Sequence, residues 1–397
     1  MTERLYYNDS FLREFDAHVV NCVEARGKWE VTLDRTAFYP ASGGQPNDLG
    51  TLGAANVLDV IDREIDHEIL HLIDRPLDRG GVVSGQIDWQ RRFDHLQQHT
   101  GQHLLSAAFI ELFDIPTVSF HLGREISTID LAASAITAMQ LAEAERRTNQ
   151  IIFEDRPINV LYGTSEQLAA AGIRKKVERE GILRAVEVEG FDRQPCGGTH
   201  ASRTGQVGLI ILRKFEKLKG NWRLEFVCGW RAARSSHADA DALSSAARTF
   251  SCAPSDVPAV AAKIAEERQA THHERQRLIE QLADLQASAL AQQAVKANGS
   301  GIRVISKLLQ DADAAYARLL ASKLVAEPGR RALLATTGGH VVFAQSSGAD
   351  RDMNALLREC VSQQGGKGGG SHDFAQGSVP SPSRAAAVLD QALSILK

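Results

Sequence analysis

Two pairs of potential metal ligands lie far apart in this sequence, and together they restrict the folds that the chain can adopt. The first pair is His99 and His103, in a segment whose apolar residues recur at helical spacing. Residues four apart share one face of a helix, so both imidazoles can reach a single ion. The second pair, Cys196 and His200, encloses two glycines that permit a tight backbone. One ion can bind all four side chains only if the fold brings the two segments together.

The four side chains offer one thiolate and three imidazoles, a ligand set that zinc favours in tetrahedral geometry. Each pair alone has an ordinary alternative: histidines paired without metal, or a buried thiol beside a core histidine. Their occurrence in one predicted domain favours zinc. His95 is a further candidate, which could replace one ligand, support the ligands from behind, or face RNA. The segment lacks the glutamate of the HExxH motif, so a zinc protease is disfavoured.

The hydrophobic pattern predicts an α+β chain, long enough at 397 residues for two or three domains. Residues 1–90 alternate apolar and polar residues between glycine turns, most clearly over Lys28 to Asp34, which predicts a β-barrel-like N-terminal domain. Residues 91–235 mix helical and strand-like segments, with a helix over 94–113 and a strand over 151–161. We expect this central domain to hold the zinc.

Residues 236–300 are predicted to be a helical linker, dominated by one long helix over 257–297. Four apolar residues of this helix recur at coiled-coil spacing: Leu278, Leu282, Leu285 and Ala289. The seam is short, so we expect the helix to pack on its own chain rather than to pair with a second copy, although a homodimer through this helix or the C-terminal domain stays open. Asn298 to Gly301 is predicted to be a hinge. Residues 301–397 are predicted to form a small α/β domain.

The net charge of −4 carries no overall signal for nucleic acid, so RNA binding must depend on local basic patches. Such patches occur at Arg174 to Lys176, at Arg213 to Lys219 and at Arg330–Arg331. Five scattered cysteines do not suggest disulfides. The N-terminus has no apolar segment typical of a secretory signal, and no run approaches the length of a membrane span. A cytoplasmic protein is the expectation.

Ordered motifs along the whole chain resemble one family. The barrel region contains three of them: Thr36 to Pro40, Gly43 to Pro46 and Asp48 to Gly50. The central region contains four more: Arg91 to Phe93, His99 to Leu105, His121 to Leu131 and Cys196 to His200. These motifs resemble the editing domain of alanyl-tRNA synthetase and its free-standing relatives, the AlaX-type alanyl-tRNA editing proteins. Gly365 to Gly370, with Ala375 to Gly377, resembles the DHHA1-type RNA-binding domain that ends the longer members.

The resemblance implies a hydrolase that acts in trans on alanine tRNA mischarged with serine or glycine. Its cofactor would be Zn²⁺, held by His99, His103, Cys196 and His200. Charging activity is not expected, because about 90 residues before the metal-binding region cannot hold an ATP-binding synthetase core. A second site is needed for such substrates because a pocket built for alanine rejects an isostere with an added hydroxyl only weakly.

The resemblance also implies roles for particular residues. Thr36 matches the position that hydrogen-bonds the serine side chain, and Gln45 is expected to act in the pocket with the backbone of Gly43 and Gly44. Zinc could activate a water or anchor the substrate, and the sequence leaves both open. Contacts to RNA phosphates are expected from the glycine-rich segment Gly365, Gly366, Lys367, Gly368, Gly369 and Gly370.

Two other functions stay open at this point. One is a different metalloenzyme, such as a peptidase or phosphoesterase, that shares only the zinc ligands. The other is a zinc-stabilised protein that binds tRNA without turnover.

Overall fold

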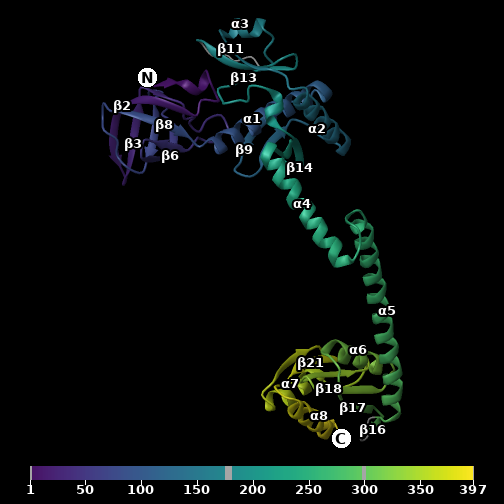
Figure 1. The fold of residues 1–397 in the computed structure, drawn as a ribbon. Helices are drawn as coiled ribbons and strands as arrows, with labels where there is room; N and C mark the ends of the chain where they lie inside the picture. The colour runs from purple at the N-terminus through teal and green to yellow at the C-terminus, as the bar shows by residue number, and fades with distance from the viewer. Residues whose placement is uncertain (1, 175–180, 297–300, 397) are drawn as a thin grey trace. The chain divides into compact units, whose positions relative to one another are not determined.

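The computed structural model describes residues 2–174, 181–296 and 301–396, and the chain divides into two compact units, Met1–Ser245 and Ala246–Lys397 (Figure 1). Among the described residues, every helix is too short or too polar to cross a lipid bilayer. Two predictions fall partly outside the described residues: the basic patch at Lys175 and Lys176, and the hinge at 298–300.

Six strands near the N-terminus close into a barrel, so the prediction of a β-barrel-like region is confirmed. Around the barrel the strands are β2 (Glu14–Ala25), β3 (Lys28–Leu33), β7 (Ile69–Ile73), β6 (Ala55–Asp62), β5 (Gly50–Leu52) and β8 (Val82–Ile87). Buried and exposed residues alternate along them because successive side chains of a strand point to opposite faces. Three short elements lie outside the barrel: β1 (Glu3–Arg4), the 3-10 helix η1 (Leu5–Tyr7) and β4 (Arg35–Thr36). The strands β1 and β4 pair in parallel.

A long helix, α1 (Trp89–Phe113), follows the barrel and carries the first pair of histidines. Asp88 begins it by accepting a hydrogen bond from the amide of Arg91, and Asp114 ends it in the left-handed conformation, with φ 54°. All residues from His95 to Phe109 are buried. A helix enclosed on every side holds its side chains rigidly, which suits ligands at positions i and i+4.

An antiparallel sheet packs against α1, in the order β14-β15-β10-β9. Its strands are β9 (Thr117–Leu122), β10 (Ser127–Leu131), β14 (Ile210–Lys217) and β15 (Trp222–Cys228). The helix α2 (Ala138–Phe153) completes this core. The prediction of a strand beginning at Ile151 was wrong. Ile151 and Ile152 form part of the last turn of α2, and both are buried in this core.

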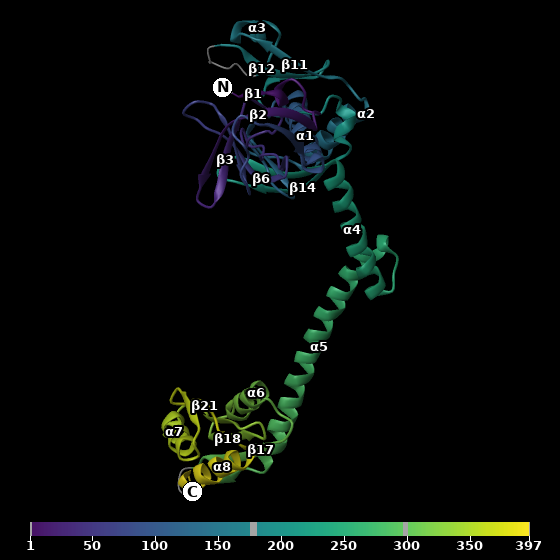
Figure 2. The same cartoon turned by 60° about the vertical axis from the view of Figure 1, so that its left-hand side comes forward.

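A smaller sheet, in the order β11-β12-β13, precedes the second pair of ligands. It consists of β11 (Ile158–Gly163), β12 (Leu183–Val188) and β13 (Asp192–Pro195), with the helix α3 (Ser165–Ala170) beside it (Figure 2). Leu168 of α3 packs on Ala185 of β12. Because β13 ends at Pro195, the sheet sets the position of Cys196 directly. A 3-10 helix, η2 (Thr204–Val207), contacts both α1 and α2.

The helices α4 (Gly229–Phe250) and α5 (Val257–Gln292) occupy the region predicted to be a helical linker, with η3 (Pro254–Asp256) between them. The C-terminal turns of α5 pack on α6 (Ala314–Val325) through small residues, among them Ala283 and Ala287. The leucine seam lies elsewhere on the helix: Leu278, Leu282 and Leu285 are 49–70% exposed. As expected, α5 packs on its own chain. Its buried small residues make this contact, and the leucine seam does not.

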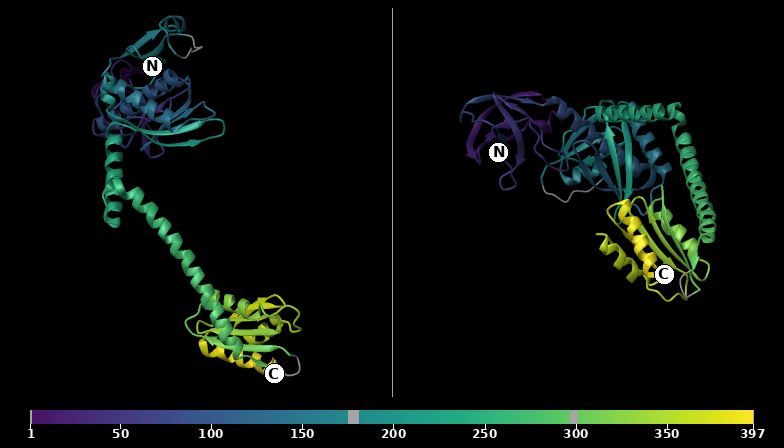
Figure 3. Two further views of the ribbon diagram at one scale, coloured as in Figure 1. Left: turned by 90° about the vertical axis from the view of Figure 1, so that its right-hand side faces the viewer. Right: turned by 90° about the horizontal axis from the view of Figure 1, so that it is seen from below.

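The second unit is built on one six-stranded sheet, in the order β16-β17-β18-β19-β21-β20. The strands are β16 (Val295–Lys296), β17 (Arg303–Leu309), β18 (Arg330–Thr336), β19 (His340–Gln345), β20 (Lys367–Gly370) and β21 (Phe374–Ser378). The helices α7 (Met353–Gln363) and α8 (Pro382–Leu396) pack on one face of the sheet, and α5 and α6 on the other (Figure 3). Along β18, Leu333 faces α7 and α8 while its neighbour Leu334 faces α6, so both faces of this strand are apolar.

Candidate metal centre

The structure brings the two predicted pairs of ligands together. His99 and His103 project from α1, and Cys196 and His200 from the loop after β13. Their four ligand atoms all lie within 4.8 Å of one another. The Sγ atom of Cys196 is 3.5 Å from Nε2 of His99 and 3.2 Å from Nε2 of His200. A tetrahedral zinc site with bonds of about 2.0–2.3 Å has edges of roughly 3.3–3.8 Å. The two distances from Cys196 are close to these edges, and the four donor atoms lie near enough to one another to hold a metal ion.

Burial sets the protonation states that a metal needs. Desolvation lowers the pKa of His99 to about 3 and holds the pKa values of His103 and His200 well below the ordinary range. All three imidazoles are therefore neutral at pH 7 and offer lone pairs. Burial raises the pKa of the Cys196 thiol, although the Gly198 amide and the Arg184 cation act against that rise. A bound divalent cation favours the thiolate strongly.

Two of the three imidazoles are oriented by a hydrogen bond from the ring nitrogen opposite the cluster. Nδ1–H of His99 donates to Oε1 of Gln45 at 2.8 Å, which leaves the lone pair of Nε2 facing Cys196. Nδ1 of His200 lies 3.3 Å from Oγ1 of Thr100. Such outer hydrogen bonds fix the tautomer and the ring orientation of metal-binding histidines.

The loop from Cys196 to His200 is held from outside by Arg184 on β12. Its Nη1 donates to the carbonyl oxygens of Cys196 at 2.7 Å and Gly198 at 2.9 Å. Gly198 permits the close approach of the loop to α1, since a Cβ atom there would lie 2.2 Å from Cε1 of His99. The predicted need for glycine between the two ligands therefore has a specific physical cause at this position.

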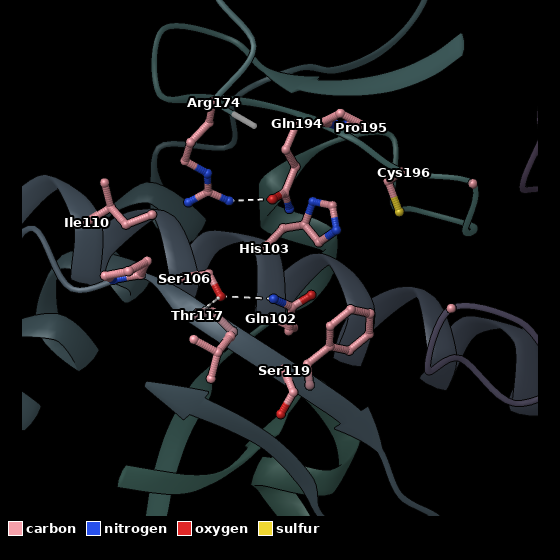
Figure 4. Close-up of a pocket in the computed structure, with 15 residues that line it drawn as sticks. Gln102, His103, Ser106, Ile110, Thr117, Ser119, Arg174, Gln194, Pro195 and Cys196 are labelled. Carbon is pink, nitrogen blue, oxygen red and sulfur yellow. Dashed lines mark hydrogen bonds between the residues drawn. The ribbon is translucent and has the colours of Figure 1, made fainter. Parts of the chain in front are cut away.

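A cavity of about 710 Å³ opens beside the cluster, and His103 and Cys196 form part of its wall (Figure 4). Side chains of α1, β9 and β13 contribute most of the remaining wall. The lining residues with polar side chains that sequence reasoning did not identify are Gln102, Ser106, Thr117, Ser119 and Gln194, while Arg174 of the predicted basic patch also lines the cavity. Only Gln102 had a sequence signal, its place inside the His99–His103 motif; the others depend on tertiary packing.

Two known domain families match the chain. Residues 183–225, which include Cys196 and His200, match the "Threonyl and Alanyl tRNA synthetase second additional domain", and residues 301–397 match the DHHA1 domain. The alanyl-tRNA editing protein AlaX-L of Pyrococcus horikoshii is 32% identical over 390 residues, covering 96% of this chain and 95% of that protein. The chain belongs to the alanyl-tRNA editing proteins. The editing protein Aarsd1 of Mus musculus is 36% identical over 261 residues, covering 61% of this chain and 63% of its own.

Part of an alanine–tRNA ligase is also similar in sequence to this editing protein. The alanine–tRNA ligase of Pyrococcus abyssi is 29% identical over 409 residues, covering all of this chain and 44% of the ligase.

Gln45 of this editing protein lies behind the ligands rather than in the wall of the cavity. It is buried, its Nε2 donates to Oγ1 of Thr199 at 2.7 Å, and its Oε1 accepts from His99. The turn before it brings Gly43 into the cavity wall, and a Cβ atom on Gly44 would lie 2.8 Å from the ring of Phe120. The positions suit a supporting role for Gln45 and a lining role for Gly43.

Thr36, the residue expected to select the substrate, is fully buried in the barrel region. Nδ1–H of His71 donates to the carbonyl oxygen of Val31 at 3.2 Å, so Nε2 of His71 accepts from the Thr36 hydroxyl at 2.8 Å. Thr36 is not among the described residues that line the cavity. Its role in selection stays a prediction.

His95, the alternative ligand, lies outside the cluster. It is 4% exposed, and burial lowers its pKa to about 3, with Arg91 and Arg231 adding to the effect. The fold thus separates two histidines that helical spacing alone could not distinguish.

The glycine-rich segment near the C-terminus forms the edge strand β20. Glycine is required there by packing: a Cβ atom on Gly368 would lie 2.4 Å from Leu357 of α7, and one on Gly370 would lie 2.2 Å from the carbonyl oxygen of Phe374. Lys367 is exposed and lines a shallow pocket of about 290 Å³ together with Arg318 and His340. The expected contacts of Gly365 to Gly370 with RNA stay a prediction, and the cationic side chains near this segment include Lys367, Arg358 beside Gly369 and Arg384 beside Gly365.

Proposed function

We propose that this protein hydrolyses the ester of alanine tRNA mischarged with serine or glycine, with zinc bound by His99, His103, Cys196 and His200. The observation that carries the proposal is the convergence of these four donors at the wall of a cavity of about 710 Å³. The family of the chain supports the same reaction, since its relatives are named alanyl-tRNA editing proteins. The cavity has room for an aminoacyl group and part of a nucleotide.

When bound, zinc supplies Lewis acidity, which polarises an ester carbonyl or lowers the pKa of a water. The chain's own residues prepare this site. Gln45 retains the Nδ1 proton of His99 and so directs the Nε2 lone pair into the cluster. Arg184 holds the backbone of the Cys196–His200 loop and places a positive charge near the thiolate. These contacts organise the donors before substrate arrives, which reduces the cost of reaching the reactive geometry.

We propose that the predicted domains have separate functions, with the predicted boundaries between them. Residues 1–90 and 91–235 would form the editing region, 236–300 the helical linker, and 301–397 the RNA-binding domain. Lys367, Arg318 and His340 would contact phosphates of the tRNA, which would act as the partner of both regions. Pairing of two copies through α5 remains a further proposal, and the exposed leucine seam supports it.

The deciding experiment measures the deacylation of seryl-, glycyl- and alanyl-tRNA, all on alanine tRNA, with and without a chelator. We expect hydrolysis of the seryl and glycyl esters, loss of activity after chelation, and recovery on adding zinc. Binding of the tRNA with no turnover of any ester would instead support a zinc-stabilised carrier. Turnover that survives complete removal of zinc would contradict a catalytic metal.

A further inference from the structure

Two polar atoms in the wall of the cavity beside the cluster are buried and have no hydrogen-bond partner among the described residues. They are Oε1 of Gln102 and Nη1 of Arg174. The first is an acceptor and the second a charged donor. A buried polar atom left without a partner is destabilising, so such atoms are uncommon unless a ligand or a water satisfies them. The pair matches a ligand that carries a donor group at one end and an electron-rich oxygen at the other.

One hydrogen bond engages the nitrogen of the Gln102 amide. Nε2 donates to Oγ of Ser106 at 2.9 Å, and Oγ of Ser106 lies 2.7 Å from Oγ1 of Thr117 (Figure 4). Because Ser106 accepts from the amide, its own proton is available for Thr117. This chain of hydrogen bonds leaves Oε1 of Gln102 as an acceptor with no donor.

The position of Gln102 places this acceptor beside the proposed reaction centre. Gln102 is adjacent in sequence to the ligand His103 on the rigid helix α1, and it is 4% exposed. His103 and Cys196 line the same cavity. An amino acid held at the cluster through its ester therefore has its side chain within the same small space as Gln102.

Other polar groups of the described lining are already engaged. Oγ of Ser119 donates to Asp130 at 2.6 Å, and Oε1 of Gln194 accepts a hydrogen bond from Arg174. Phe120, Ile110 and Pro116 make the rest of the wall apolar. Gln102 thus supplies the buried side-chain oxygen that remains free to accept from a ligand.

We propose that Oε1 of Gln102 accepts a hydrogen bond from the side-chain hydroxyl of a serine ester and so determines the preference for serine over amino acids that lack a hydroxyl. The inference rests on the proposed function and deepens it. A site that pairs with a hydroxyl discriminates against analogues without one far better than an apolar pocket does, because the analogue leaves a buried polar atom unpaired. The hydroxyl of Thr36 is bonded to His71, and Thr36 is not among the described residues that line this cavity.

The test uses non-hydrolysable analogues in which serine, glycine or alanine is joined by an amide to 3′-amino-3′-deoxyadenosine. Their binding to the full zinc-loaded chain is measured by calorimetry, beside kcat/KM for the matching tRNA esters. Gln102→Met removes the acceptor at similar volume, and Gln102→Glu retains an acceptor. Gln90→Met, at an exposed position of the same helix, is the matched control. Zinc content is determined for every variant.

We expect Gln102→Met to weaken binding of the seryl analogue about tenfold while the glycyl and alanyl analogues change less than twofold. Gln102→Glu should keep the seryl preference, and Gln90→Met should match the wild type. An equal loss for all three analogues would overturn the proposal by showing that Gln102 contacts a group they share, such as the α-ammonium. An unchanged seryl preference in Gln102→Met would overturn it as well.

The two proposals fail in different ways. A wild-type protein that deacylates none of the tRNA esters contradicts the proposed function, whatever the analogues show. A wild type that deacylates seryl-tRNA, together with a Gln102→Met variant that keeps the wild-type ratio of seryl to glycyl binding, contradicts the role of Gln102 alone. Because the ratio is measured on one preparation, partial loss of folded protein or zinc does not alter it.

Discussion

His99 and Gln45 are joined by a hydrogen bond of 2.8 Å from Nδ1 to Oε1, although they belong to different parts of the fold. Gln45 follows a tight turn near the barrel, and His99 lies in the middle of α1. The same amide also bonds Thr199, directly beside His200. One buried glutamine therefore connects both pairs of ligands.

This connection predicts the effect of replacing Gln45. Gln45→Met keeps the volume but removes the acceptor for His99, so the imidazole loses its fixed tautomer and orientation. Loss of such an outer partner typically lowers metal affinity by about 10–100-fold. Competition titration against a zinc chelator measures the change, with Gln90→Met as control. Wild-type affinity in Gln45→Met would show that the hydrogen bond does not organise the ligand.

The two glycines of the Cys196–His200 loop are expected to differ in their tolerance of alanine. A Cβ atom at position 198 would lie 2.2 Å from His99, whereas one at position 197 meets nothing closer than Tyr7 at 3.9 Å. Gly198→Ala must displace either the His99 ring or the loop, so we expect loss of most bound zinc and a lower melting temperature. Gly197→Ala should retain zinc. Metal analysis and thermal unfolding of the two variants make a matched comparison, and equal behaviour would contradict the steric argument.

The sequence allowed the grouping of the four candidate donors to be predicted, because residue type and spacing carry that information. His99 and His103 share a helix face, and Cys196 and His200 flank glycines. The partners of these ligands could not be predicted in the same way. The bond between Gln45 and His99 joins residues 54 apart, and the loop contacts of Arg184 depend on the pairing of β12 with β13.

The same limit applies to one expectation about the fold and one about the site. The end of α2 was assigned to a strand because Ile151 and Ile152 have high strand propensity, which tertiary burial overrides. The resemblance implies that Gln45 acts in the pocket, but it does not specify which side chains Gln45 contacts. Only the packed structure shows that its side chain turns towards His99.

The buried pair of His71 and Thr36 predicts a dependence of stability on pH. Burial lowers the pKa of His71 to about 4 from an ordinary value of 6.5. The unfolded chain therefore binds a proton that the folded chain excludes, so the free energy of unfolding falls as the pH decreases from 6.5 towards 4. Over that range one such group accounts for about 3 kcal/mol.

The measurement is urea unfolding of the unit Met1–Ser245 in the whole chain, followed between pH 7 and pH 5. His71→Gln removes one of several buried histidines in this unit and should make the decrease less steep, at the cost of lower stability at pH 7. His18→Gln, an exposed position on β2, is the control and should keep the wild-type slope. A slope that is identical in His71→Gln and the wild type would assign the decrease to other groups.

The C-terminal unit is expected to bind tRNA electrostatically through Lys367. This residue is exposed on β20 and shares its pocket with Arg318 and His340. Lys367→Ala should weaken tRNA binding. It should also reduce the slope of log affinity against log salt concentration by about 1, the contribution of one phosphate contact. Lys263→Ala, which removes an exposed lysine of α5 near Glu267, should leave the slope unchanged. Equal slopes for both variants would place the RNA contact elsewhere.

The two histidines His95 and His99 offer the sharpest comparison for the metal centre, because they lie one helical turn apart and are both buried. Only His99 belongs to the group of four donors. In His99→Ala the zinc affinity and the deacylase activity should both fall by at least 100-fold, because three donors of the set remain. In His95→Ala one zinc per chain should be retained, even if removal of a buried ring lowers the melting temperature. Zinc content measured on the folded fraction separates the two effects. If His95→Ala lost its zinc while His99→Ala kept it, the arrangement of donors described above would be incorrect.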